Sequence, residues 1–333
     1  SSLIVEVTLL DEVKLHPNAN ALELGIIKGW QVVIPKGKYK TGDKVVYFPP
    51  DTIIPKELSD RLEVTKYLSN QRIRCTRLRG EPSFGLVISP DKDWNVGTDV
   101  AEYYNATKYE QPIKFSISDM KKDDPLFPKY TDIENLRHFT DVLIPGEEVI
   151  VTEKIHGTSG RVGIINDELF AGSHKYSRKN PGEEEWKVNR YWFPFSLENV
   201  RSFLEEYASK VPNINLYGEI FGKKIQTMEY GQSGINFTVF DVLADDNYLN
   251  YDDLMRIVKP FNLLTVPVLY RGPFSMDVVK QMSEGKAFSG NHIREGVVIK
   301  PVQERIHPKI GRVILKYISD NYLLKNYEDF SDV

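Results

Sequence analysis

Short strand patterns separated by glycine and proline turns fill the first part of the chain, and they limit most strongly how it can fold. The candidate strands cover residues 3–10, 22–28, 30–34, 44–48, 73–78 and 85–89. Turn signals fall between them at residues 35–37, 41–43 and 79–82. Strands this short, joined by turns this tight, predict a small antiparallel barrel.

Two groups of basic residues lie on the predicted barrel. They are Lys36, Lys38, Lys40 and Lys44, followed by Arg72, Arg74, Arg77 and Arg79. Alternation along a strand predicts that Arg72 and Arg74 share one face. With Tyr39, Tyr47 and Phe48 nearby, the pattern is typical of an OB fold that holds nucleic acid through phosphates and stacking. The alternative is a solvated charged face without a partner.

Length and composition set further limits on the kind of protein. A chain of 333 residues favours two domains over one. Its net charge is -4, so any nucleic-acid contact has to come from local basic groups. The single cysteine, Cys75, excludes a disulfide framework and favours a reducing intracellular compartment, cytoplasmic or nuclear. We expect no membrane span and find no signal peptide, while an organelle-targeting segment ahead of Ser1 stays open.

Regular structure is weakest over residues 101–135, which contain scattered prolines and a charge cluster at 121–124. We therefore predict an OB-fold domain over residues 1–101, a connector over 102–117 and a second domain over 118–333. A short helix over 133–139 is expected to lead into the second domain.

The second domain mixes strand and helix patterns. Strands are predicted over 148–152, 160–165, 168–171, 215–221, 236–243, 295–300 and 312–318, with a hairpin turn at Asn166 and Asp167. Helices are predicted over 196–209, with Ser196 as N-cap, and over 251–258 and 275–283. The predicted fold class is α+β, with an OB-like β-barrel followed by a domain of antiparallel sheets and flanking helices.

Lys154 follows one of these strands and opens a loop that continues with Ile155, His156, Gly157 and Thr158. A lysine amine can attack a phosphorus or carbonyl centre when burial or neighbouring cations lower its pKa. The glycine permits a close backbone approach to a ligand, and the threonine can bond a phosphate. Taken alone, the segment is a weak signal, because most lysines are solvated surface charges.

Five segments of the chain together resemble the covalent nucleotidyltransferases, the superfamily of polynucleotide ligases and capping enzymes. They are Lys-Ile-His-Gly-Thr at 154–158, Tyr-Gly-Glu-Ile-Phe-Gly at 217–222, Phe-Thr-Val-Phe-Asp-Val at 237–242, Arg-Glu-Gly-Val-Val-Ile-Lys at 294–300 and Val-Ile-Leu-Lys at 313–316. The first and fourth segments are similar to RNA ligases, since DNA ligases usually carry Asp in place of His156. An OB-like module ahead of these segments resembles one branch of ATP-dependent RNA ligases.

The resemblance implies three catalytic lysines. Lys154 would attack the α-phosphate of ATP and form lysyl-AMP with release of pyrophosphate. Lys300 and Lys316 would lower the pKa of Lys154 by like-charge repulsion and neutralise the phosphate in the transition state.

The same resemblance implies a nucleotide site. Glu219 would bind the ribose, Phe240 would stack on adenine, and the backbone at Glu153 would read the adenine edge, with Ile155 and Gly157 completing the contacts. The alternatives are core packing for Phe240 and a solvent-facing strand carboxylate for Glu219.

A divalent metal site is also implied. Glu295 and Glu219 would hold Mg²⁺ or Mn²⁺, because carboxylate oxygens suit these hard cations. His156 would take part through a water molecule or orient the loop, and we do not assign it as a general base.

The sequence departs from the family pattern in two places. Related ligases often carry two lysines in the last segment, whereas Ile314 here takes the first position, so one phosphate contact is either missing or supplied by Lys300 or Lys309. The residue that contacts the RNA 5′-phosphate is expected within 171–180, where Lys175 and Arg178 both remain open.

These features predict an ATP-dependent RNA ligase that seals 3′-OH and 5′-phosphate ends through lysyl-AMP and adenylylated RNA, in RNA repair. The expected partner is RNA, as a nicked or broken duplex or an RNA/DNA hybrid, and the expected state is a monomer. The alternatives are an mRNA-capping guanylyltransferase, which would use GTP, and a nucleic-acid-binding protein without activity.

Overall fold

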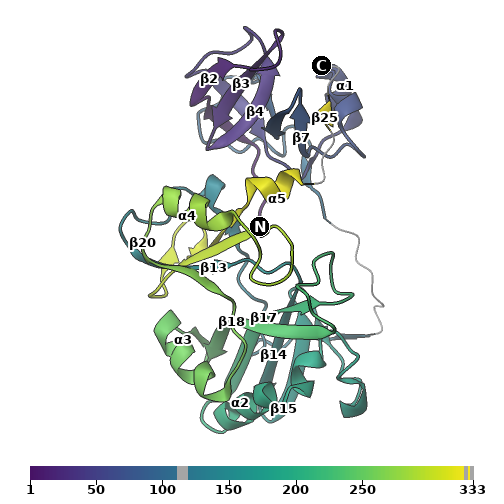
Figure 1. Cartoon of the computed structure of the whole chain (residues 1–333), viewed down its shortest axis with the longest axis vertical. Coiled ribbons are helices and arrows are strands. Elements are labelled where there is room, and N and C mark those ends of the chain that lie inside the picture. The colour runs from purple at the N-terminus through teal and green to yellow at the C-terminus, as the bar shows by residue number, and fades with distance from the viewer. Residues whose placement is uncertain (111–118, 326–328, 331–333) are drawn as a thin grey trace. The chain divides into compact units, whose positions relative to one another are not determined.

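The computed structural model describes residues 1–110, 119–325 and 329–330, which form two compact units (Figure 1). The first unit comprises Ser1–Ile113 together with Leu323–Val333, and the second comprises Lys114–Tyr322. The predicted boundaries at 101 and 117 stay predictions, because the expected connector lies partly outside the described residues. No helix in the described part of the chain is both long and apolar enough to cross a membrane.

The first unit is built from short strands that pair antiparallel, as predicted, apart from the parallel pairing of residues 329–330 with 77–78. Three strands, β1 (Glu6–Leu9), β5 (Lys44–Phe48) and β9 (Leu86–Ile88), form one sheet, and β2 (Glu12–Leu15), β3 (Leu22–Ile27) and β4 (Trp30–Pro35) form another. A third sheet contains β25 (Asp329–Phe330), β7 (Cys75–Leu78) and β8 (Glu81–Phe84). Smaller elements are β6 (Thr52–Ile53), β10 (Thr107–Lys108) and α1 (Lys56–Arg61).

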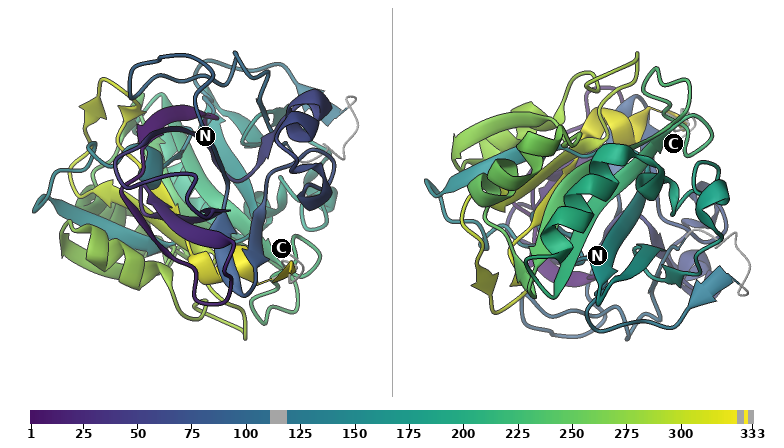
Figure 2. Two further views of the ribbon diagram at one scale, coloured as in Figure 1. Left: turned by 90° about the horizontal axis from the view of Figure 1, so that it is seen from above. Right: turned by 90° about the horizontal axis from the view of Figure 1, so that it is seen from below.

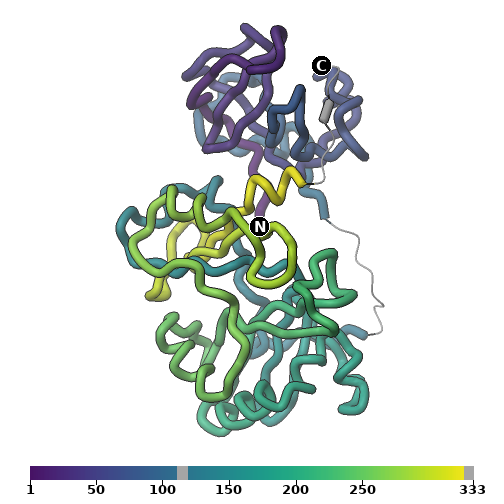
Figure 3. The backbone as a smooth tube through the Cα atoms, viewed as in Figure 1, coloured from purple at the N-terminus to yellow at the C-terminus, as the bar shows by residue number. Residues whose placement is uncertain are grey.

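Strand β5 lies at the centre of the first unit, because both of its faces are buried. Val46 and Phe48 belong to one hydrophobic cluster, and Val45 and Tyr47 belong to a second. Leu323 and Leu324 pack against the second cluster, so the chain returns to this unit after completing the other one. The return runs through α5 (Asp320–Leu324), drawn in yellow in the backbone trace (Figure 3).

Two details of the predicted nucleic-acid face on the barrel are wrong. Tyr39, Tyr47 and Phe48 are core residues with exposures of 5%, 2% and 0%, so none can stack on a base. Arg72 precedes β7 and does not share a strand face with Arg74. Its guanidinium instead donates to Asp51 at 2.6 and 2.9 Å.

The second unit contains two sheets. The larger has the order β11 (Met120–Lys121), β16 (Ser177–Arg178), β15 (Glu168–Ser173), β14 (Thr158–Ile165), β17 (Asn213–Gly222), β18 (Ile235–Ala244) and β19 (Asn247–Tyr248). The smaller has the order β12 (Glu134–Asn135), β24 (Leu315–Ile318), β21 (Gly296–Pro301), β13 (Glu148–Glu153) and β20 (Val268–Pro273). Apart from β12 with β24, the named strands in these two sheets pair antiparallel.

Helices cover both sheets of the second unit, which confirms the predicted α+β class. Helix α2 (Glu198–Ala208) packs Val200, Phe203 and Leu204 onto the larger sheet, and its course across the sheet is visible from below (Figure 2). Helix α3 (Tyr251–Val258) joins the same core, whereas α4 (Met276–Ser283) packs on the smaller sheet.

The predicted hairpin turn at Asn166 and Asp167 and the predicted helix near residues 275–283 are both confirmed. Asn166 and Asp167 both have left-handed φ values, 50° and 64°, in the turn between β14 and β15. Ser275 caps α4 by accepting from the Val278 N–H at 3.3 Å.

Other local predictions were wrong. Ser196 does not cap α2, because its hydroxyl donates to the Phe193 carbonyl at 2.7 Å and the helix begins after Leu197. The predicted helix over 133–139 is β12 followed by a 3₁₀ turn over Leu136–His138. The predicted strand over 312–318 divides into β23 (Gly311–Arg312) and β24.

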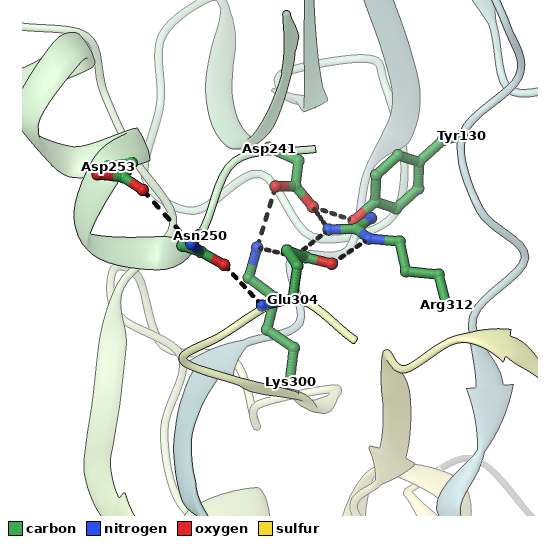
Figure 4. A network of polar contacts seen from close by, with 7 residues as sticks. All are labelled: Tyr130, Asp241, Asn250, Asp253, Lys300, Glu304 and Arg312. Atoms are coloured by element: carbon green, nitrogen blue, oxygen red, sulfur yellow. Dashed lines mark hydrogen bonds and ion pairs between the residues drawn. The ribbon is translucent and has the colours of Figure 1, made fainter. Parts of the chain in front are cut away.

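A buried ion network joins the two sheets of the second unit (Figure 4). Asp241 on β18 accepts from Tyr130 and Arg312 at 2.6 Å each, and from Lys300 on β21 at 3.0 Å. Glu304 accepts from Arg312 at 2.6 and 2.7 Å, so two cations face two carboxylates. Burial alone would raise the pKa of Asp241, but Lys300 and Arg312 lower it below its ordinary value.

We expect Asp241→Asn to lower the free energy of unfolding by about 3 kcal/mol, because it leaves buried cations without their carboxylate. Denaturant unfolding followed by fluorescence would measure the change. Asp141→Asn is the matched control, since Asp141 pairs with Lys309 at the surface and such pairs contribute about 1 kcal/mol or less. Similar losses in the two variants would contradict a structural role for the buried network.

Candidate active site

The antiparallel pairing of β13 with β21 places Lys154 beside Glu295. Lys154 directly follows β13 and Glu295 directly precedes β21, with Glu153 opposite Val297. The N–H of Lys154 donates to the Gly296 carbonyl at 2.9 Å. The Lys154 ammonium then forms an ion pair with Oε1 of Glu295. Two segments that resembled ligase motifs are thus brought together by strand pairing.

The charges in this site follow from burial and from one another. Burial alone would lower the pKa of Lys154, but the carboxylates of Glu295 and Glu219 raise it above its ordinary value. Burial alone would raise the pKa of Glu295, but Lys154 and the contact with His156 lower it to about 2. Burial raises the pKa of Glu219 to about 8, against the opposing effect of Lys154. The three groups therefore titrate as a coupled set, in which Lys154 and Glu295 favour each other's charged forms.

The prediction that Lys300 and Lys316 lower the pKa of Lys154 is wrong. The carboxylates around Lys154 raise its pKa, and Lys300 lies in the buried network with Asp241 and Glu304. Lys316 is half-buried on β24, opposite Val298 of β21. The charge of Lys300 is therefore already balanced by carboxylates of the protein.

Four side chains contact the ring and the backbone N–H of His156 and fix its orientation. Its Nδ1 lies 2.8 Å from Glu295 Oε2 and 3.2 Å from the Tyr322 hydroxyl, and its Nε2 lies 3.2 Å from the Thr227 hydroxyl. Its backbone N–H donates to the Tyr230 hydroxyl at 2.7 Å. These contacts agree with the expectation that His156 orients the loop. Sequence reasoning missed Thr227, Tyr230 and Tyr322, because no motif spacing points to them.

Gly157 brings the Lys154 loop against β17. A Cβ at this position would lie 2.3 Å from the Ile220 carbonyl oxygen and 2.9 Å from Cγ of Glu219, closer than packing permits. The close approach that the sequence predicted is therefore made to a strand of the protein. Ile155 fixes the other side of the loop, since its side chain is buried with Phe221. Any nucleotide contact at Ile155 would come from its backbone.

Glu153 holds a neighbouring segment in place. Its buried carboxylate accepts from the Phe288 N–H at 3.0 and 3.1 Å and lies 3.4 Å from Arg294. Its own N–H donates to the Pro267 carbonyl at 2.9 Å. The side chain therefore has a structural role, and a backbone contact with adenine stays a prediction.

Phe240 occupies a β-bulge on β18. Gly218 pairs with Val239 and Tyr217 pairs with Asp241, so Phe240 is the extra residue. A bulge redirects side chains, and Phe240 and Asp241 both contact Tyr130, the two rings with centroids 4.9 Å apart. Phe240 is half-buried, so one part of its surface is accessible and stacking on adenine stays a prediction.

The structure separates the two candidates for the RNA 5′-phosphate. Arg178 is buried on β16, with its guanidinium 5.0 Å from the centre of the Tyr191 ring. Lys175 is exposed in the turn between β15 and β16. Ile314, where a lysine was expected, is a core residue that packs with Tyr130. Lys309 forms a surface ion pair with Asp141, away from that core position.

The residues present fit Mg²⁺ or Mn²⁺. Glu295 and Glu219 supply hard oxygen donors, and Mg²⁺ typically takes one or two carboxylates together with waters and substrate phosphates. No group of three His, Cys, Asp or Glu side chains that could enclose an ion occurs among the described residues. Two carboxylates leave the other coordination positions of such an ion to waters and substrate phosphates.

Glu295→Gln is expected to lower the pKa of Lys154, because burial then acts without the main opposing charge. The pH dependence of Lys154 acetylation, followed by mass spectrometry, would measure it. Glu229→Gln, which changes an exposed carboxylate on the segment between β17 and β18, is the control. An unchanged titration of Lys154 in Glu295→Gln would contradict this account of the ion pair.

Glu219→Gln is expected to make stability less dependent on pH. A carboxyl whose pKa rises from 4.5 to about 8 on folding stabilises the folded state fully below pH 4.5 and loses that contribution as the pH rises through 8. Between these values the parent protein should lose roughly 2 kcal/mol relative to the variant, with the effect reduced by the partial exposure of Glu219. Urea unfolding at several pH values would test this, and parallel curves would contradict it.

Comparison with known proteins gives two family matches. An RNA ligase family model matches residues 147–318, and an OB-fold domain model matches residues 4–90. The chain matches no curated protein sequence. The first match includes Lys154, Glu219 and Glu295, and the second confirms the predicted OB fold.

Solved structures of RNA ligases from Naegleria gruberi are similar over almost the whole chain. An apo variant is 26% identical, with a TM-score of 0.81, and the match covers 97% of this chain and 98% of that one. A variant with ATP and Mn is 27% identical, with a TM-score of 0.80 and coverage of 96% and 98%. A structure with PPi is 27% identical, with a TM-score of 0.79 and coverage of 98% and 99%. Because the RNA ligase model spans more than half of the sequence and contains the Lys154 site, the chain belongs to the RNA ligase family.

Proposed function

We propose that this protein is an ATP-dependent RNA ligase that joins 3′-OH and 5′-phosphate ends through an AMP adduct on Lys154. The observation that carries the proposal is the position of Lys154 at the end of β13, paired with Glu295 and beside Glu219, within the region that matches the family. The Naegleria gruberi ligases with ATP and Mn support the choice of nucleotide and metal.

In the first step the Lys154 amine attacks the α-phosphate of ATP. A P–N bond forms, the bond to pyrophosphate breaks, and the amine has to be neutral beforehand. The ion pair with Glu295 keeps Lys154 protonated in the resting site. A divalent cation held by Glu295 and Glu219 would polarise the α-phosphate. Burial favours the neutral form of the Lys154 amine, whereas Glu295 and Glu219 favour the protonated form.

The surrounding residues position the nucleotide. We assign Glu219 to the ribose and Phe240 to the adenine, with His156 holding the loop around Lys154. Lys316 is the lysine that we assign to the phosphate. Lys300 acts through the network that fixes β21, because its ammonium is already paired with Asp241.

The second and third steps act on RNA. AMP moves from Lys154 to a 5′-phosphate, for which the exposed Lys175 is the better contact, and a 3′-OH then displaces AMP and closes the phosphodiester. We propose a nicked or broken duplex, or an RNA/DNA hybrid, as substrate. A monomer in a reducing compartment, acting in RNA repair, is the corresponding setting. The OB-fold unit would hold nucleic acid through its exposed basic residues.

The intact mass of the protein after incubation with ATP and Mg²⁺ or Mn²⁺ tests the proposal. We expect a gain of one AMP on the parent chain and complete loss of the adduct in Lys154→Ala. Lys259→Ala, which removes an exposed lysine after α3, is the control and should keep the adduct. An adduct of GMP from GTP would instead indicate a capping-type activity, and no adduct with any nucleotide would contradict the ligase mechanism.

A further inference from the structure

An open groove in the second unit lies beside the ends of β17 and β18. Its cavity volume is about 600 Å³. The lining residues are Val188, Arg190, Lys223, Lys224, Ile225, Ser233, Gly234 and Ile235. They include three cations but no carboxylate and no aromatic ring. The acidic 3₁₀ turn Glu183–Glu185 precedes the groove along the chain, yet none of its carboxylates lines it.

The three cations of this groove are available to a ligand. Arg190, Lys223 and Lys224 are exposed, and within the described residues their side chains form no ion pair or hydrogen bond. Other cations of this unit are paired at the surface, as Lys309 is with Asp141 and Arg201 with Glu183, whereas these three lie together in one groove without a carboxylate. A group of unbalanced positive charges in one groove favours an anionic partner.

Strand β17 and the connection from β17 to β18 link the groove to the candidate active site. Lys223 and Lys224 directly follow β17, which carries Glu219. The connection that they begin continues to Thr227 and Tyr230, the residues that hold His156. Ile225, between these two sets, is buried in the core against the larger sheet. The cations are therefore held in a defined position relative to the Lys154 loop.

We propose that this groove, lined by Arg190, Lys223 and Lys224, binds the sugar-phosphate backbone of the RNA that is being sealed. The proposal rests on the ligase function proposed above and adds a substrate contact to it. Ammonium and guanidinium groups bind phosphates without reading sequence, and a groove without aromatic rings offers no base stacking. Val188, with 73% of its surface exposed, adds an apolar contact suited to a ribose.

The test compares two double variants that lose the same charge. Lys223→Ala/Lys224→Ala changes the groove, and Lys122→Ala/Lys259→Ala removes two exposed lysines outside it. The probe is a fluorescent RNA duplex with a 5′-phosphorylated nick, and binding is followed by anisotropy over a range of salt concentrations without ATP. We expect the groove variant to bind about tenfold more weakly or worse. The slope of log affinity against log salt should fall by about 1 to 2, because two phosphate contacts are lost.

Two further measurements separate the outcomes. Lys223→Arg/Lys224→Arg keeps the charges and should retain affinity, and thermal unfolding of all variants checks that they fold. Equal RNA affinity in the groove and control variants would contradict RNA binding in the groove. The ligase proposal would still stand if the parent forms its AMP adduct. Absence of that adduct would overturn the ligase function itself, whatever the RNA affinity.

Discussion

The register between β13 and β21 is the constraint on which the active site depends. It sets Glu153 opposite Val297, so that the residues just beyond each strand, Lys154 and Glu295, meet as an ion pair. A slip of one residue would turn every side chain of the slipped strand to the opposite face and separate this pair. Gly157 adds a second restraint, since only a residue without a Cβ lets the loop lie against β17 and bring Glu219 into the site. Pairing and close packing of the backbone therefore bring Lys154, Glu219 and Glu295 together.

The second unit uses lysine in two physically different ways. Lys300 is buried, and both Asp241 and Glu304 balance its charge within a network that joins two sheets. Lys154 is partly exposed, with 26% of its side chain accessible, and has one close carboxylate partner. A nucleotide can compete for a single partner more easily than for a closed network. This difference in burial and pairing favours a covalent role for Lys154 and a structural role for Lys300.

The sequence predicted which candidate site residues meet in space better than it predicted their surroundings. The motifs around Lys154, Glu219 and Glu295 mark residues that do meet in space, because each motif is a short local string. The groups that hold His156 come from a connection and a short helix, where no periodicity or spacing identifies them. Ile314 shows the same limit, since only the packed structure reveals that this position belongs to the core.

The strand patterns predicted secondary structure well, but they did not predict which side chains of a strand are exposed. Both faces of β5 are buried, so alternation could not tell that Tyr47 packs inward. The ends of elements depended on competing hydrogen bonds, as at Ser196, whose hydroxyl bonds to a preceding carbonyl instead of capping α2. The predicted OB-fold class is confirmed in spite of these errors, because it depends on strand number and turn spacing more than on the orientation of single residues.

The return of the chain to its first unit has a consequence for how the protein is made. Leu323 and Leu324 complete a hydrophobic cluster whose other members lie between Leu10 and Val87. During synthesis from the N-terminus, those earlier residues emerge from the ribosome long before their last partners. The second unit, by contrast, is one continuous segment and can collapse as it appears. The unit translated first therefore becomes fully packed only after residues 323 and 324 have been translated.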